Sequence, residues 1–263
     1  MSLLHLELGR PWPWLSCYEL GHTTRPHMIS FIVPAHNEEA WVGRCVTAIR
    51  SAMELVGEQH EVIVVDDAST DATGLVAQQQ GAQVIRVEHR QISATRNAGA
   101  RQARGEILFF VDADTLVSAP VIQPALRSIR EGAVGGGSVP RFEGWLPLWW
   151  RVVYPSVVGI VRLLRFSPSG ACLFCTDGVF KAAGGFNENY YAAEDALFVA
   201  ALKRHGRFVV IAEQVVTSGR KLRAHSFWSL AWQLTRLALR GSRGLRNRRG
   251  LDYWYAPARE RTK

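Results

Sequence analysis

Residues 105–115 read Gly-Glu-Ile-Leu-Phe-Phe-Val-Asp-Ala-Asp-Thr. The apolar run 107–111 is short and stops at two carboxylates, which is typical of a strand buried on both faces. Side chains two apart in an extended chain point to the same side, so Asp112 and Asp114 can face one point beyond the strand. Mg²⁺ or Mn²⁺ binds one or two protein carboxylates together with substrate phosphates. This stretch therefore fits a metal site, and it fits equally well two aspartates that only solvate a loop.

Apolar runs and helical patterns alternate on both sides of this strand. Strands are expected at 29–33, 62–65 and 84–87, and helices at about 41–53 and 93–103. Such alternation predicts an α/β fold with a mainly parallel central sheet flanked by helices. Ligands of these sheets bind beyond the carboxyl ends of the strands. Polar clusters follow three of the expected strands, so we expect them to converge on one crevice; they are 34–39, 66–71 and 112–114.

The second half of the chain is less regular. We expect strands at 133–142, 172–176 and 208–212 and a helix over 194–205. In the first half, Asp71 is expected to cap a short helix that Gly81 ends. The longest apolar region, 145–166, is interrupted by three arginines and is too short to span a membrane as a helix.

Composition restricts the function. The 263 residues carry a formal net charge of +8, which favours an anionic partner. Cys172 and Cys175 form a C-x₂-C pair without a second pair at zinc spacing, so we expect no zinc site and a reducing, cytoplasmic location. No G-x-G-x-x-G follows the first expected strand and no G-x₄-G-K-[ST] is present, which argues against the usual dinucleotide fold and against a P-loop.

Four segments together resemble a family 2 glycosyltransferase. They read ISFIVPAHNEE (29–39), VIVVDDASTD (62–71), RNAGARQARGEILFFVDADT (96–115) and GGFNENYYAAEDALFVAAL (184–202). The resemblance implies the A-type glycosyltransferase fold, a single nucleotide-diphospho-sugar transferase domain over 29–216. It divides that domain into a nucleotide-binding half, 29–115, and an acceptor half, 116–216. Residues 1–28 would be an extension, and 217–263 a basic helix and tail.

The resemblance also assigns roles in inverting sugar transfer. Asp195 would be the general base, with Glu194 beside it, and Asp114 and Asp112 would bind Mg²⁺ or Mn²⁺. The donor nucleotide, a UDP-sugar by preference, would contact Pro34, His36, Glu38, Asp66, Asp67, Arg96 and Asp112. Independently of the resemblance, Arg220 in the basic loop 217–223 is expected to close over the diphosphate. His36 stands where members of the family usually carry tyrosine. Each of these residues also has an alternative without a role in transfer. Glu194 and Asp195 would be acids that stabilise a helix N-terminus, and Asp66 and Asp67 would stabilise a turn. Arg96 would be an exposed helix charge, and Arg220 would lie in a solvated basic loop.

Two other functions compete with this one, a sugar-nucleotide nucleotidyltransferase and an idle nucleotide-sugar binder. The acceptor is open between a sugar, a lipid-linked molecule and another small molecule. The basic helix expected at 226–240 either packs on the domain or lies peripherally on an anionic membrane surface. Nucleic acid is not expected as a partner, because the basic residues lack interleaved exposed aromatics.

Overall fold

The structure is a computed structural model that describes residues 28–163, 171–224, 232, 235, 244–248 and 251. The N-terminal extension expected over 1–28 and the basic helix expected over 226–240 therefore lie almost entirely outside the described residues. Among the described helices, none is long and apolar enough to cross a membrane.

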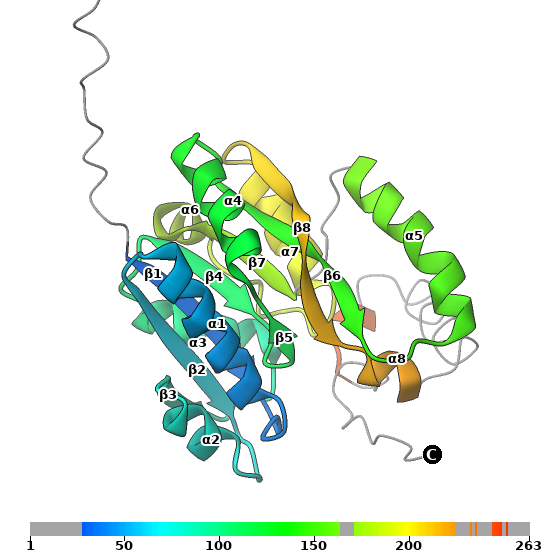
Figure 1. The fold of residues 1–263 in the computed structure, drawn as a ribbon, viewed down its shortest axis with the longest axis horizontal. Coiled ribbons are helices and arrows are strands. Elements are labelled where there is room, and N and C mark those ends of the chain that lie inside the picture. Colours follow the sequence, from blue (N-terminus) through cyan, green and yellow to red (C-terminus); the bar gives the residue numbers. More distant parts are fainter. Residues whose placement is uncertain are drawn as a thin grey trace, which may run out of the picture.

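The described residues form one eight-stranded sheet in the order β3-β2-β1-β4-β7-β6-β8-β5 (Figure 1). The strands are β1 (Ile29–Ala35), β2 (His60–Asp67), β3 (Gln83–Val87), β4 (Ile107–Val111), β5 (Thr115–Leu116), β6 (Gly135–Glu143), β7 (Cys172–Thr176) and β8 (Phe208–Ser218). Strands β3, β2, β1 and β4 are parallel to one another, as are β6 and β8. The expected mainly parallel α/β sheet is confirmed. It is mixed because β7 runs against β4 and β6, and β5 runs against β8.

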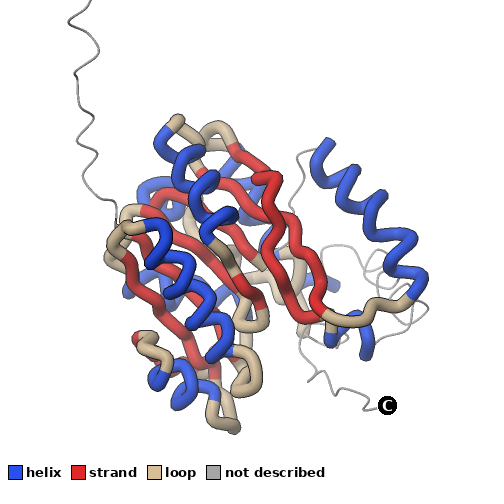
Figure 2. Tube along the Cα trace, viewed as in Figure 1, coloured by secondary structure: helices blue, strands red, loops and turns tan. Residues whose placement is uncertain are grey.

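Helices cover both faces of this sheet (Figure 2). They are α1 (Val42–Val56), α2 (Thr73–Gln79), α3 (Ile92–Gln102), α4 (Ala119–Arg130), α5 (Leu148–Leu163), α6 (Asp177–Ala182), α7 (Glu194–Lys203) and α8 (Arg220–Ala224). One core cluster joins a face of the sheet to α1 and α4, and the other joins the opposite face to α3, α6 and α7. Helix α5 stands apart from these layers (Figure 1).

Strand β4 is central to both cores and has the bounds expected from the sequence. Phe109 faces the α1 side, where it stacks between Phe31 and Phe174 at centroid distances of 5.0 and 5.4 Å. Phe110 faces the α7 side and meets Phe180, Phe186 and Phe198. A strand whose alternate side chains enter two cores must be apolar throughout, which is why a continuous apolar run identified it.

Three local expectations need correction. The N-cap of α2 is Ala72, and its side chain makes no capping bond; Asp71 lies one residue earlier and accepts the Thr73 N–H at 3.0 Å. Strand β8 continues past 212 to Ser218, because its polar second half pairs with β6 across an irregular register and with β5. Helix α7 ends at Lys203, not His205. The division of the domain into a nucleotide-binding and an acceptor half stays a prediction.

Helix α3 lies directly against the sheet at Gly99. A Cβ atom at this position would come 2.5 Å from Cγ2 of Ile32 and 2.8 Å from Cγ2 of Val65. We therefore expect Gly99→Ala to lower the free energy of unfolding by about 1–3 kcal/mol, measured by urea denaturation. The matched control is Gly159→Ala on α5, where a Cβ would meet nothing within 4 Å. That change should leave stability within about 1 kcal/mol of the parent, on the stabilising side. Equal effects of the two changes would show that contact with the sheet is not what excludes a side chain at 99.

Candidate active site

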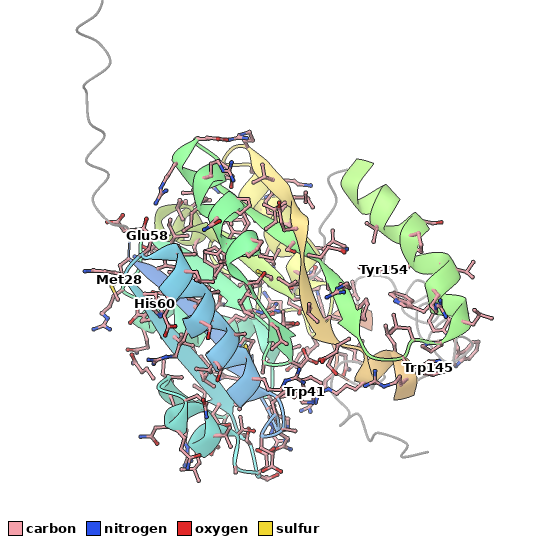
Figure 3. All side chains as sticks on the ribbon, in the orientation of Figure 1. Met28, Trp41, Glu58, His60, Trp145 and Tyr154 are labelled. Atoms are coloured by element: carbon pink, nitrogen blue, oxygen red, sulfur yellow. The ribbon has the colours of Figure 1, made fainter. Side chains whose placement is uncertain are left out.

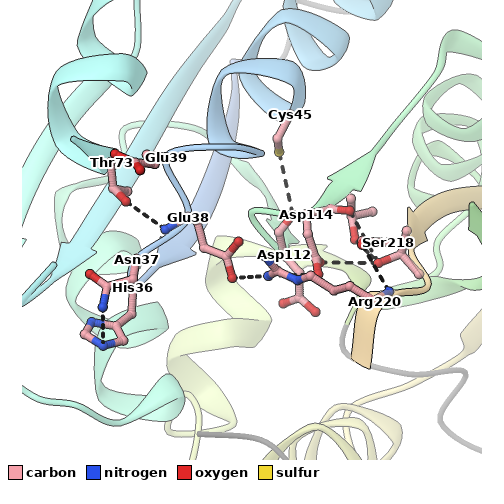
Figure 4. A network of polar contacts seen from close by, with 12 residues as sticks. His36, Asn37, Glu38, Glu39, Cys45, Thr73, Asp112, Asp114, Ser218 and Arg220 are labelled. Atoms are coloured by element: carbon pink, nitrogen blue, oxygen red, sulfur yellow. Dashed lines mark hydrogen bonds and ion pairs between the residues drawn. The ribbon is translucent and has the colours of Figure 1, made fainter. Parts of the chain in front are cut away.

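The carboxyl ends of β1, β2 and β4 converge, as the sequence predicted. The register aligns Ala35 at the end of β1 with Asp66 in β2. His36 Nδ1 donates to the Asp67 carbonyl oxygen at 2.7 Å, and the Glu38 N–H donates to Thr73 Oγ1 at 2.7 Å. The loops after β1 and β2 therefore form one polar edge beside Asp112 and Asp114 (Figure 4).

A buried arginine lies between Asp112, which was predicted to bind the metal, and Asp195, which was predicted to be the base. Arg96 on α3 is only 2% exposed, so the alternative of an exposed helix charge is excluded. Its Nη2 donates to Asp112 Oδ1 at 2.9 Å, and its Nη1 donates to Asp195 Oδ1. Nη1 also lies 3.7 Å from Glu194 Oε1. Three acids from two distant parts of the chain, the end of β4 and the start of α7, thus share one guanidinium.

The charged groups of this cluster shift the pKa values of Arg96 and Glu194. Burial alone would lower the pKa of the Arg96 guanidinium, but the carboxylates of Asp195, Asp112 and Glu194 hold it above its ordinary value. Burial, followed by the negative charge of Asp195, raises the pKa of the Glu194 carboxyl to about 8. At neutral pH Glu194 is therefore largely protonated, and it adds little negative charge beside Arg96.

Asp114 belongs to a second ionic group, which joins the ends of β1, β4 and β8 (Figure 4). Its Oδ2 lies 3.3 Å from Arg220 Nη2, and the same nitrogen donates to Glu38. Thr217 Oγ1 lies 3.3 Å from Asp114 Oδ1. Arg220 is 12% exposed and its guanidinium lies over the Trp41 ring at 5.8 Å, so it is not part of a solvated loop.

A divalent cation fits this edge only in combination with other ligands. Within the described part of the chain, no three histidine, cysteine or carboxylate side chains are grouped so that they could hold a metal ion. Asp112 and Asp114 supply two carboxylates from one strand end, and the Asp112 side chain is 38% exposed. The contact of Asp114 with a guanidinium shows that this carboxylate accepts a cation here. Two carboxylates completed by substrate phosphates match the coordination that Mg²⁺ commonly has.

The expected nucleoside residues lie at the same edge, but Asp66 and Asp67 are engaged within the protein. Asp67 is buried and accepts the Arg90 and Gln91 N–H groups at 2.8 and 3.1 Å and the Thr95 hydroxyl at 2.7 Å. Asp66 accepts the Ser69 N–H at 3.2 Å. These contacts hold the loops after β2 and β3. A role of Asp67 in binding the base, and of His36 and Pro34 beside it, stays a prediction.

The sequence analysis missed the residues by which α3 holds the loop before α7. Asn97 Nδ2 donates to the Phe186 carbonyl oxygen and to Glu188 Oε1, both at 2.8 Å. Gln91 Nε2 donates to the Glu188 carbonyl oxygen at 2.6 Å. The loop ends at Ala193, whose φ of 61° is left-handed, directly before Glu194. The polar residues of the Arg-Asn-Ala-Gly segment were a signal, because a helix buried against a sheet needs partners for them. Trp41 and Thr217 carried no such signal.

Comparison with known proteins is consistent with this geometry. The family model of Glycosyl transferase family 2 matches residues 30–179, more than half of the chain. The curated relatives include a putative glycosyltransferase, EpsH of Bacillus subtilis, which is 29% identical over 105 residues. That match covers 38% of this chain and 30% of EpsH. The chain spans between 28% and 46% of the length of the first three curated relatives.

Solved structures share the fold at low sequence identity. The mannosyltransferase PcManGT of Pyrobaculum calidifontis, in complex with GDP-Man and Mn²⁺, has a TM-score of 0.58 at 21% identity. The match covers 81% of this chain and 61% of that one. Glucosyl-3-phosphoglycerate synthase of Mycobacterium tuberculosis, in complex with Mn²⁺, UDP-glucose and phosphoglyceric acid, has a TM-score of 0.55 at 20% identity. That match covers 81% of this chain and 77% of the synthase.

The raised pKa of Glu194 predicts how stability depends on pH. The folded state keeps a proton that the unfolded chain releases at its ordinary pKa of 4.5, so this group lowers the free energy of unfolding as pH rises from 4.5 to about 8. Glutamine does not ionise. The stability of Glu194→Gln relative to the parent should therefore be greater at pH 8.5 than at pH 5, by about 1–4 kcal/mol in denaturant titrations.

A control for general charge effects is Glu54→Gln, on the exposed side of α1. Its stability relative to the parent should be the same at both pH values. If Glu194→Gln behaves in the same way as this control, Glu194 is ionised in the folded state throughout the range.

Proposed function

This chain belongs to glycosyl transferase family 2, and we propose on that basis that it transfers a sugar from a nucleotide-diphosphate donor, a UDP-sugar by preference, to an acceptor hydroxyl with inversion. The family match covers the loops after β1, β2 and β4. Two solved proteins of the same fold, PcManGT and the mycobacterial synthase, bind Mn²⁺ with GDP-Man and UDP-glucose. Those ligands support a nucleotide-sugar donor and a divalent metal for this chain.

The contact of one arginine with both Asp112 and Asp195 is the observation that carries the proposal. Inverting transfer needs the leaving diphosphate and the acceptor's base close to one anomeric carbon but on opposite sides of it. Arg96 bonds to the carboxylates assigned to both tasks. The predicted contact of Arg96 with phosphate receives no support from these bonds. They favour a role in fixing the two carboxylates relative to each other.

In this proposal Asp195 is the general base. Its side chain is 24% exposed, so an acceptor can reach it, and its contact with Arg96 fixes its position. Asp195 would take the proton of the acceptor hydroxyl as that oxygen attacks the anomeric carbon and the bond to the diphosphate breaks. Glu194 is only 6% exposed and largely protonated at neutral pH, which makes it a poor base. We assign it a structural part in the cluster.

The leaving diphosphate would be met by Asp114, Asp112 and Arg220. A divalent cation held by the two aspartates would supply positive charge to the departing diphosphate. Arg220 bonds to Asp114 and Glu38 in the structure, so it lies close enough to meet the same phosphates. The acceptor is a sugar, a lipid-linked molecule or another small molecule, and the predicted location is the cytoplasm.

Nucleotide binding tests the donor site directly. We expect one of UDP, GDP, CDP and dTDP to raise the melting temperature in the presence of Mn²⁺ or Mg²⁺, with UDP favoured. A ligand at about 100 times its Kd stabilises the folded state by about 2.7 kcal/mol. That corresponds to a shift of roughly 5–10 °C for a chain of this size. Asp114→Asn should remove the metal-dependent part of the shift.

The matched control is Asp177→Asn. Asp177 follows β7, whose last residue Thr176 pairs with Ile107 at the start of β4, so it lies at the opposite edge of the sheet. This variant should keep the full shift. If no nucleotide stabilises the parent with either metal, or if both variants lose the shift equally, the donor site is not where we place it.

Asp195→Asn separates chemistry from binding. Asparagine keeps the shape of the side chain but accepts protons poorly. We expect the variant to retain the nucleotide- and metal-dependent thermal shift, while hydrolysis of the matching sugar donor, in which water takes the place of the acceptor and nucleoside diphosphate is released, falls by about 10²–10⁴-fold. Asp177→Asn again serves as the control. Unchanged release in Asp195→Asn would contradict the assignment of the base, and a parent that binds but never releases would be an idle binder.

A further inference from the structure

Helix α5 is attached to the domain along one side only. Trp150 and Tyr154, one turn apart, pack on Phe142 of β6 at centroid distances of 5.5 and 5.7 Å. The Tyr154 hydroxyl donates to the Pro140 carbonyl oxygen. Figure 3 shows Tyr154 on the side of α5 that faces the sheet. These aromatic contacts fix which face of the helix points toward the protein.

The other face of α5 is apolar and exposed. Leu148 and Val152, also one turn apart, are 72% and 70% exposed, and Val153 is 40% exposed. Trp145, just before the helix, is 67% exposed (Figure 3). Other large apolar side chains of the described residues, such as Leu55 and Leu75, are exposed singly on separate helices. Exposed apolar residues that gather on one element mark an interaction surface.

The segment that carries this face is basic, and so is a later stretch of the sequence. The sequence has no acidic residue from 144 to 176, where it has three arginines, of which Arg151 on α5 is exposed. It has none from 214 to 251 either, and that stretch carries nine lysines and arginines. A second copy of the chain would bring like charges together at this face, which is unfavourable. A partner with a negatively charged surface and an apolar interior complements both the exposed apolar side chains and the basic residues.

We propose that α5, together with Trp145, docks on the surface of an anionic lipid bilayer. Leu148, Val152 and the Trp145 ring enter the boundary between headgroups and acyl chains, and Arg151 meets lipid phosphates. The helix lies on the bilayer and does not span it, because its 16 residues are only about 24 Å long, less than the hydrocarbon thickness.

This surface lies close to the candidate active site along the chain and in space. Arg223 on α8 donates to the carbonyl oxygens of Glu143 and Trp145, at 3.2 and 3.5 Å. Three residues earlier, Arg220 contacts Asp114. The segment that leads into α5 therefore packs on the helix that begins with an active-site arginine. Bilayer docking goes beyond the proposed transfer reaction and does not depend on it.

Vesicle flotation with the full chain tests the docking. We expect the protein to float with vesicles that contain phosphatidylcholine and phosphatidylglycerol, to float weakly with phosphatidylcholine alone, and to bind less at high salt. The double variant Leu148→Ser/Val152→Ser should partition at least tenfold less into the anionic vesicles. The matched control is Leu55→Ser/Leu75→Ser, which removes two exposed apolar side chains from α1 and α2 and should float as the parent does.

Several outcomes would overturn the proposal. One is absence of flotation with either vesicle, and another is equal loss in the two double variants. Flotation that the α5 variant leaves unchanged would assign lipid binding to another part of the chain. Self-association that only the α5 variant abolishes, seen by light scattering without vesicles, would make the partner a second copy. If the double variant melts below the parent, Trp145→Ser, which lies outside the helix, repeats the test. The thermal-shift measurements with nucleotides contain no vesicles, so the proposed donor site and the proposed docking surface are tested independently of each other.

Discussion

The burial of one guanidinium constrains the whole active site. Arg96 is 2% exposed, and an arginine this deep is tolerated only where carboxylates pair with it. Its partners come from the end of β4 and the start of α7, and its guanidinium also lies 5.1 Å from the Phe186 ring centroid. Loss of both carboxylates would leave the buried guanidinium without a counter-charge. The position of α7 relative to β4 is therefore fixed by charge as well as by the phenylalanine core.

Hydrogen bonds between its loops hold the polar edge of the sheet together. Asn37 accepts the Thr70 N–H at 2.8 Å, and its own N–H donates to Ser69 Oγ at 3.0 Å. The Glu39 N–H donates to the Asp71 carboxylate, and the Ala72 N–H, next to Asp71, donates to the Glu39 carboxylate. These contacts join the loop after β1 to the loop after β2. Loops that are already hydrogen-bonded to each other lose less conformational entropy when a ligand binds between them.

The sequence predicted those parts of the fold that local pattern determines. The bounds of β4 and β7 agree with expectation, because a short apolar run with sharp polar ends leaves little choice. The second half of β8 was missed, since its Glu213, Thr217 and Ser218 belong in a strand only through pairing with β5 and β6. The residues of the site could be named from their motifs, but their partners could not. Arg96 and Asp195 are 99 residues apart, and nothing in either segment indicates that they meet.

That separation of 99 residues has a consequence for biosynthesis. The contact of Arg96 with Asp112 closes within 16 residues, so it can form as soon as β4 is complete. The contact with Asp195 must wait until α7 has left the ribosome, as must the cover of Phe110 by Phe186 and Phe198. Closing the longer loop is also entropically more expensive. A nascent chain that stops short of α7 thus exposes one apolar face of its sheet beside an arginine that contacts only one of its carboxylates. Such a chain is a natural substrate for chaperones and proteases, and the contact of Arg96 with Asp195 forms only once α7 is available to cover that face.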